Sequence, residues 1–343
     1  MDVLFDDNET EKAERTSLLN ELDNLVQGKL LSRELWACLR LADLARLRFM
    51  LSELRMLNSP KVYLDGLELA LRESKLVTYW KQSRNVSRAS SVAAAPSQAS
   101  SPTQPDVSES PATPSSGPRK RQRLEYQVRD RTQRDLCLER DGHKCVITNS
   151  GEPVEVAHIF PFTMRNLQTP EARSQDFNLW NVLKYFWTEE KVNKWLNAIQ
   201  AITETLKNLL CLAPHTHAYQ NKAFFALKYV ESNEDNTSLT VMFMWLPHFD
   251  HPHLLRACTD PSAALVTKFR KDAAGGVVSL LNTSTEAPVA TGDQIILETT
   301  DPVNLPLPDV DILELHWVLQ RVAAMAGGAE PEEITYETDD EDV

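Results

Sequence analysis

Three residues of this chain have the types and spacing needed to meet in one small polar site: His158, Asn208 and His217. His158 closes a short apolar segment, and Asn208 directly precedes a second apolar run over residues 209–212. That run predicts a strand, and Pro214 behind it predicts the first turn of a helix, so a strand, a turn and a helix would bring Asn208 and His217 together. Histidine suits proton transfer near neutral pH and also binds metal ions.

The same segments resemble the ββα-metal fold of HNH endonucleases, in particular the HNH-domain proteins of fungi. In that family a strand ends in a histidine between alanine and isoleucine and a proline follows, as His158 and Pro161 do here. Residues 178–187 and 217–228 are also similar to the family, and the resemblance extends over roughly residues 124–247. It implies an α+β fold with a ββα-metal core that contains inserted helices.

The resemblance also implies a mechanism for hydrolysing phosphodiester bonds in DNA. His158 would be the general base that activates water, and Asn208 would hold the loop and the imidazole in place. His217 would bind a divalent metal ion, with Mg²⁺ as the expected ion and Mn²⁺ or Zn²⁺ as alternatives. The metal ion would stabilise the charge that develops on the leaving oxygen.

One position departs from the family. Many HNH nucleases carry a metal ligand directly before the general base, where this chain has Ala157. Glu155 and His215 are the candidates to replace that ligand, although Glu155 lies two residues away on its strand and His215 does not share a helical face with His217. An alternative function is therefore a catalytically silent HNH scaffold that acts in protein interaction or regulation.

Each candidate residue also has a purely structural interpretation. A histidine at a strand end is often half buried, an asparagine often stabilises a turn, and histidines on a helix are often surface residues. The clustered His248, His251 and His253 favour an exposed loop over a metal site. The aromatic residues within 175–206 follow a helical period, which favours a core over a surface that stacks on bases.

The composition favours a soluble protein with a sizeable core. The chain has 343 residues, of which 42% are hydrophobic. No apolar run approaches the ~20 residues that span a bilayer, and the acidic N-terminus lacks a secretory signal. The five cysteines include no pair separated by two residues, so their spacing supports neither a disulfide framework nor a zinc site built on cysteine. Cys145 is expected to be a small buried residue, and a reducing intracellular compartment is the natural inference.

Charge is distributed unevenly along the chain. The formal net charge is −13 at pH 7, which argues against broad non-specific adhesion to nucleic acid. A basic run nevertheless precedes the HNH-like segment and contains Arg119, Lys120, Arg121 and Arg123. It has three interpretations: a nuclear import signal, an arm that contacts phosphates, or the solvated end of a linker. The import signal is favoured, which places the protein in the nucleus rather than the cytoplasm.

We expect five segments along the chain. Residues 1–82 form an N-terminal helical region, 83–118 a disordered linker rich in Ser, Ala and Pro, and 119–260 the HNH nuclease-like domain. Residues 261–328 form a C-terminal extension with a final helix, and 329–343 a disordered acidic tail. The N-terminal helices are either a coiled-coil-like module for homo-oligomerisation or a helical cap on the core.

Apolar periodicity predicts the individual elements. In the N-terminal region, the second helix is expected to run unbroken from Leu35 to Leu54, and a third begins at Pro60 with Ser59 as its N-cap. Further helices are expected at 124–141 and 309–325, with two more within 175–206. Strands are expected at 224–230, 239–245 and 294–297.

Overall fold

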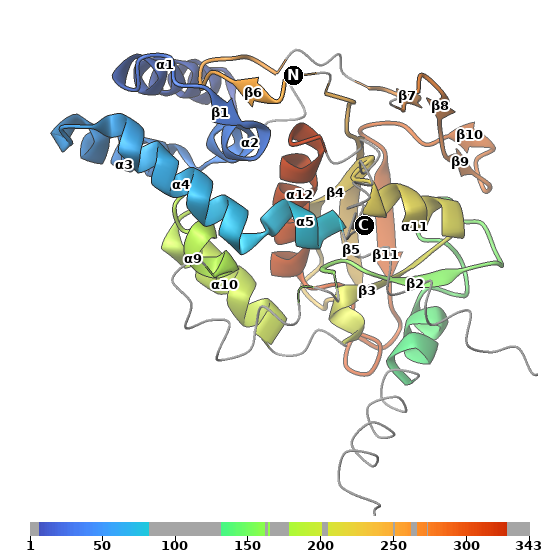
Figure 1. The fold of residues 1–343 in the computed structure, drawn as a ribbon. Helices are drawn as coiled ribbons and strands as arrows, with labels where there is room; N and C mark the ends of the chain where they lie inside the picture. The colour runs from blue at the N-terminus through green and yellow to red at the C-terminus, as the bar shows by residue number, and fades with distance from the viewer. Residues whose placement is uncertain are drawn as a thin grey trace, which may run out of the picture.

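The helix α12 (Val310–Met325) lies at the centre of the fold and is buried on almost all sides (Figure 1). Asp309 caps its first turn by accepting hydrogen bonds from the backbone N–H groups of Asp311 and Ile312. Gly327, with a φ of 83°, follows its end. A helix whose residues are buried on nearly all sides must be covered by other elements. The predicted final helix at 309–325 is thus confirmed, and it forms part of the core.

The computed structural model describes residues 7–81, 132–161, 164, 178–200, 205–249, 251–261, 266–272 and 274–327. Its mixture of helices and strands confirms the α+β class. The predicted linker at 83–118, the basic run at 119–123 and the acidic tail at 329–343 lie outside the described residues.

An antiparallel three-stranded sheet packs against α12. Its strands are β4 (Phe225–Ser232), β5 (Ser238–Trp245) and β11 (Gln294–Glu298), in the order β11-β5-β4. Helix α12 lies against β4. The first two strands were predicted as apolar segments around a polar turn and the third as a short strand in a weakly patterned segment, and all three are confirmed.

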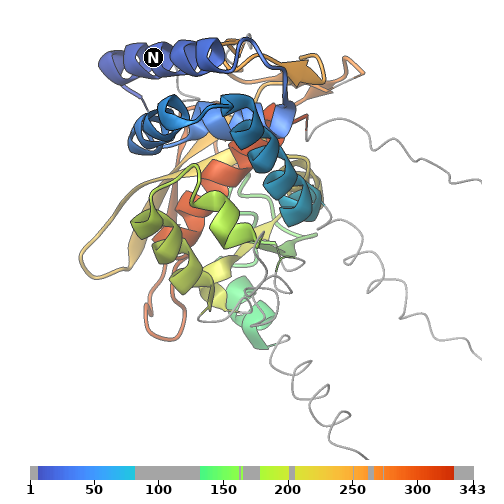
Figure 2. The same ribbon diagram turned by 60° about the vertical axis from the view of Figure 1, so that its left-hand side comes forward.

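The N-terminal helices pack onto this centre (Figure 2). They are α1 (Glu9–Leu25), α2 (Arg33–Leu41), α3 (Leu44–Met56), α4 (Pro60–Ser74) and α5 (Leu76–Lys81). Their buried side chains share one hydrophobic core with α12. This packing corresponds to the predicted helical cap, whereas oligomerisation through these helices stays a prediction.

The prediction of one unbroken helix from Leu35 to Leu54 was wrong, because the chain turns at Ala42 and Asp43 and forms two helices there. The N–H and the carboxylate of Asp43 make hydrogen bonds across the fold, while its carbonyl accepts from Arg46 and Leu47 at the start of α3. Its N–H donates to the Phe186 carbonyl, and its carboxylate accepts from the Thr188 N–H, both at 2.9 Å. The periodicity of apolar residues within a short segment cannot predict contacts with distant parts of the chain.

The segment that resembles HNH nucleases contains two strands and a helix in the expected order. These elements are β2 (Glu155–His158), β3 (Leu209–Leu212) and α11 (Pro214–Asn221). Residues 132–140 form the helix that was predicted at 124–141, as far as it is described. The insertion between β2 and β3 carries α9 (Leu179–Leu183), α10 (Glu189–Gln200) and the 3₁₀ turn η2 (Leu206–Asn208). Its aromatic residues Trp180, Phe186, Trp187 and Trp195 are buried, as predicted, whereas Tyr185 is exposed.

The remaining strands are short pairs. They are β1 (Leu31–Ser32) with β6 (Leu254–Leu255), β7 (Arg270–Lys271) with β8 (Val277–Val278), and β9 (Leu281–Asn282) with β10 (Ala287–Pro288). His251, from the histidine-rich segment, is buried with its ring 5.0 Å from that of Trp36. Within the described residues, none of the helices is long and apolar enough to cross a bilayer.

Candidate functional site

The strands β2 and β3 pair antiparallel, with the helical insertion between them in the chain. This pair of strands is called the hairpin below, and its register places the candidate residues. Glu155 lies opposite Leu212, and His158 lies opposite Leu209. Because side chains alternate along a strand, Glu155 and Ala157 leave β2 on one face, whereas Val156 and His158 leave it on the other. Helix α11 packs against β2.

Glu155 and His217 meet across this packing. The Oε2 atom of Glu155 lies 2.7 Å from Nδ1 of His217, although the two residues are 62 positions apart. The Glu155 side chain is 48% exposed and that of His217 is 16% exposed, so the pair lies at the surface of the molecule. A carboxylate on one imidazole nitrogen fixes the ring orientation and leaves the other nitrogen to bind a metal ion.

Asn208 holds the backbone that follows His158. Its Oδ1 accepts a hydrogen bond from the Phe160 N–H at 2.7 Å, and its Nδ2 donates to the Phe160 carbonyl at 3.1 Å. The Asn208 carbonyl also accepts from the Ile159 N–H at 2.9 Å. The buried amide therefore satisfies two backbone groups that leave the hairpin ladder at this point. The predicted hydrogen bond from Asn208 to this loop is confirmed.

His158 lies half-buried at the end of β2. Its carbonyl accepts a hydrogen bond from Nε2 of Gln220, which belongs to α11, at 3.1 Å. Strand alternation directs its imidazole away from the face that carries Glu155. This alternation argues against the predicted common cleft for the imidazoles of His158 and His217, which stays a prediction.

A chain of buried hydrogen bonds supports the site from behind, and its members were not singled out in the sequence. Gln320 of α12 donates from Nε2 to the Gln220 carbonyl at 2.9 Å and accepts from Nε1 of Trp80 at 3.2 Å. His316, also on α12, lies with Nδ1 3.2 Å from the Ile159 carbonyl. Burial lowers the pKa of His316 to about 4, partly opposed by that hydrogen bond. The only local signal was the presence of polar residues within an otherwise apolar helix.

The other candidate residues lie apart from the Glu155–His217 pair or outside the residues that the structure describes. His215 is exposed, and its ring meets the ring of Tyr219 edge-on with the centroids 6.1 Å apart. Ala157 is buried and has no donor atom to offer a metal ion. Cys145 is buried, as predicted. Arg119 and the rest of the basic run are not described.

A second group of donor atoms lies behind the hairpin. Among the described residues, Cys137, Asp141 and Cys211 bring their donor atoms within 4.8 Å of one another. The spacing of the cysteines gave no hint of this group. The signal that could have led to it is the four-residue step from Cys137 to Asp141, which puts both on one face of a helix.

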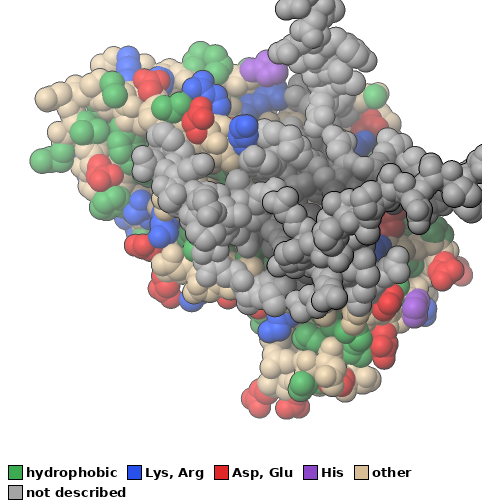
Figure 3. Space-filling model, turned by 60° about the horizontal axis from the view of Figure 1, so that its bottom comes forward, with side chains coloured by type: hydrophobic (Ala, Val, Ile, Leu, Met, Phe, Trp, Pro, Cys, Tyr) green, Lys and Arg blue, Asp and Glu red, His purple; other side chains and the backbone are tan. Residues whose placement is uncertain are grey.

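The described surface has mixed charge on the face drawn in Figure 3. Lys and Arg side chains lie there among Asp and Glu side chains.

The comparison with protein families matches one part of this chain. Residues 145–228 match a family model described as HNH endonuclease. The matched segment contains β2, β3 and α11 together with Glu155, Asn208 and His217. No curated protein and no solved structure matches the chain.

Proposed function

We propose that this HNH-domain protein is a metal-dependent endonuclease that hydrolyses phosphodiester bonds in DNA, with a ββα-metal core made by β2, β3 and α11. The match to the HNH endonuclease family supports a nuclease-like role. The contact of 2.7 Å between Glu155 and His217 carries the proposal, because it joins two of the three residues from which a metal site was expected.

His217 would bind a divalent metal ion through Nε2, while Glu155 accepts the proton on Nδ1 and holds the ring in that tautomer. The imidazole is then the protein donor that this pair offers, and it suits Zn²⁺ better than Mg²⁺ or Mn²⁺. Mg²⁺ or Mn²⁺ would take its remaining ligands from phosphate oxygens and water. When bound, the ion would stabilise negative charge at the phosphate and on the leaving 3′ oxygen.

His158 would act as the general base that takes a proton from the attacking water. Hydrogen bonds hold the backbone at His158 and just after it. Gln220 binds its carbonyl, and Asn208 binds the backbone of Phe160, two residues further on. A general base depends on such support, because a displacement of about 1 Å can lower the rate by about 10²-fold.

One observation favours a second candidate, the catalytically silent HNH scaffold. Ala157 occupies the position where many HNH nucleases carry a metal ligand, and its side chain is buried against the core. A silent scaffold would retain the hairpin and α11 but would have no use for the His158 imidazole.

Plasmid nicking separates the two candidates. Purified full-length protein with Mg²⁺ or Mn²⁺ should convert supercoiled plasmid to the open circle, and His158→Ala should slow this by ~10²-fold or more. His253→Ala, which removes an exposed histidine of the segment after β5, is the matched control and should nick at the wild-type rate. Equal rates for His158→Ala and wild type would refute the assignment of the base. Absence of nicking by every variant would support the scaffold.

The basic run is proposed as a nuclear import signal. Replacing Arg119, Lys120, Arg121 and Arg123 by Ala should abolish nuclear accumulation and leave DNA binding unchanged. Weaker DNA binding with a shallower dependence on salt would instead identify a phosphate-contacting arm, because each neutralised phosphate releases counterions.

A further inference from the structure

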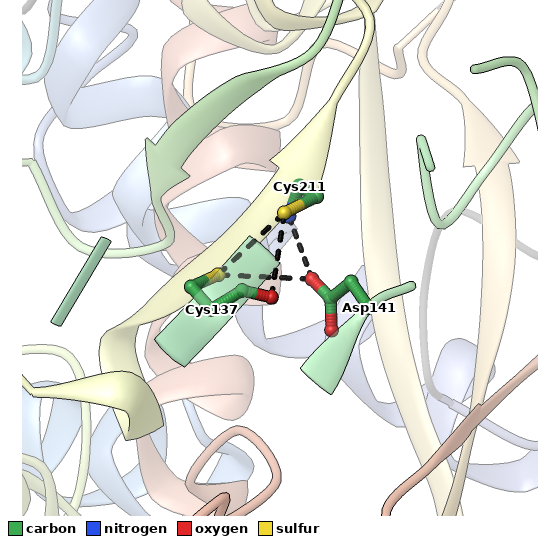
Figure 4. Close-up of side chains that lie close together, drawn as sticks. All are labelled: Cys137, Asp141 and Cys211. Carbon is green, nitrogen blue, oxygen red and sulfur yellow. Dashed lines mark hydrogen bonds between the residues drawn. The ribbon is translucent and has the colours of Figure 1, made fainter. Parts of the chain in front are cut away.

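Cys137, Asp141 and Cys211 point toward one another behind the β2–β3 hairpin (Figure 4). Cys137 and Asp141 lie about one turn apart at the end of the helix 132–140, and Cys211 lies in β3. The two Sγ atoms are 3.8 Å apart, and Sγ of Cys137 is 3.7 Å from Oδ2 of Asp141. The same Oδ2 accepts a hydrogen bond of 2.8 Å from the Cys211 N–H.

These separations correspond to the edges of a tetrahedral zinc site. With a Zn–S distance of about 2.3 Å and a Zn–O distance of about 2.0 Å, a tetrahedron has an S–S edge of about 3.8 Å and an S–O edge of about 3.5 Å. The sulfur atoms are too far apart for a disulfide bond, which is about 2.0 Å long. Thiolate donors select Zn²⁺ over Mg²⁺ and Ca²⁺.

We propose that Cys137, Asp141 and Cys211 bind a structural Zn²⁺ ion that joins the helix 132–140 to β3. The Cys137 carbonyl oxygen lies 3.5 Å from Sγ of Cys211; one of its lone pairs accepts the Asp141 N–H at 3.0 Å, and the other would take the fourth position. Both cysteines are fully buried, so a substrate could not reach the ion, which suits a structural rather than a catalytic role.

Arg140 supplies the surroundings that such a site needs. Its guanidinium binds both oxygens of Asp141, at 2.7 Å from Nε and 3.1 Å from Nη2, and Nη2 also lies 3.6 Å from Sγ of Cys137. The Arg140 side chain has no exposed surface. Burial acts to lower its pKa, but the hydrogen bonds and charge of Asp141 outweigh burial and raise the pKa. The arginine therefore stays charged, and it orients the carboxylate for the ion.

The charges balance when the ion is bound. Arg140 cancels the charge of Asp141. Binding of Zn²⁺ to the two cysteines releases their thiol protons into solvent, and the two thiolates then carry the two negative charges that the ion neutralises. A buried site whose charges cancel avoids a large desolvation cost.

This site is distinct from the one that contains Glu155 and His217. Cys211 lies opposite Val156 in the hairpin, and both belong to a small hydrophobic cluster with Cys137. Glu155 leaves the opposite face of β2, toward α11. Cys137 and Asp141 also precede the segment that matches the HNH family, which begins at residue 145.

Metal analysis of the full-length protein tests the proposal. Protein purified under reducing conditions without chelator should contain about one equivalent of zinc, and the zinc-free protein should bind Co²⁺ with a thiolate-to-cobalt charge-transfer absorption. Cys137→Ser and Cys211→Ser should lose both signals. Cys145→Ser, which changes another fully buried cysteine of the hairpin region, and His217→Ala should keep them.

Three results would overturn the proposed zinc site. The first is wild-type protein that holds no zinc and gives no charge-transfer band with Co²⁺, a result that does not depend on the folding of any variant. The second is loss of the metal in His217→Ala with retention in the cysteine variants, which would assign the ion to the proposed catalytic site. The third is a metal-free chain that is lighter by two hydrogens, which would identify a disulfide between Cys137 and Cys211.

Discussion

The carboxylate of Glu155 is in hydrogen-bond contact with the imidazole of His217, at 2.7 Å between Oε2 and Nδ1. If this contact orients His217 for a metal ion, Glu155→Gln should weaken the apparent affinity for Mg²⁺ or Mn²⁺ by about 10- to 100-fold. Nicking at saturating metal should fall much less, because the ring still binds the ion. The measurement is the metal concentration that gives half-maximal nicking.

The matched control for this prediction is Glu152→Gln, which changes an exposed glutamate of the loop before β2. It should leave the metal dependence unchanged. An identical metal dependence for Glu155→Gln and wild type would show that the contact plays no part in metal binding.

Asn208 should be a large contributor to stability. Asn208→Ala leaves the buried N–H and carbonyl of Phe160 without their partners, which should lower the free energy of unfolding by about 2–4 kcal/mol. Urea unfolding followed by circular dichroism measures the loss. Asn178→Ala removes the N-cap of α9 and should cost only about 1 kcal/mol. A loss at Asn208 no greater than at Asn178 would contradict the role given to the amide.

Gln320 should couple α12 to the proposed site. Gln320→Leu keeps most of the side-chain volume but removes the partner of Trp80 and of the Gln220 carbonyl. We expect a loss of about 1–3 kcal/mol in unfolding free energy and faster amide hydrogen exchange in α11 and at Ile159. Gln294→Leu, at an exposed position of β11, should change stability by less than about 0.5 kcal/mol. Unchanged exchange at α11 in Gln320→Leu would argue against the coupling.

His316 should make the fold sensitive to acid. In the unfolded chain its imidazole binds a proton near pH 6.5, whereas burial lowers its pKa in the folded protein to about 4. Between these values the unfolded state binds more protons, so stability is full above about pH 6.5 and falls as the pH drops toward 4. The shift corresponds to about 3 kcal/mol.

The variant His316→Asn tests this pH dependence, because Asn keeps a donor near the Ile159 carbonyl but does not titrate. Its unfolding free energy should be flatter than that of wild type between pH 4 and 6.5. Parallel pH profiles for the two proteins would assign the acid sensitivity to other groups.

The sequence alone determined the elements around the site and their order. The apolar run 209–212 became β3, Pro214 opened α11, and His158 ended β2. These outcomes depend on interactions between near neighbours in the chain, which periodicity, proline and capping residues report directly. The hydrogen bond of Asn208 to the loop after His158 was also predicted, but from the resemblance to a family rather than from periodicity.

Only the tertiary structure decided which distant side chains meet. Glu155 and His217 are 62 residues apart, and Cys137 and Cys211 are 74 apart. Their contacts depend on the register of the hairpin and on the packing of α11 and of the helix 132–140 against it. No pattern within a short window carries that information, because each residue alone has an ordinary local environment. For the same physical reason, the contacts of Asp43 divided a segment that periodicity had predicted as one helix.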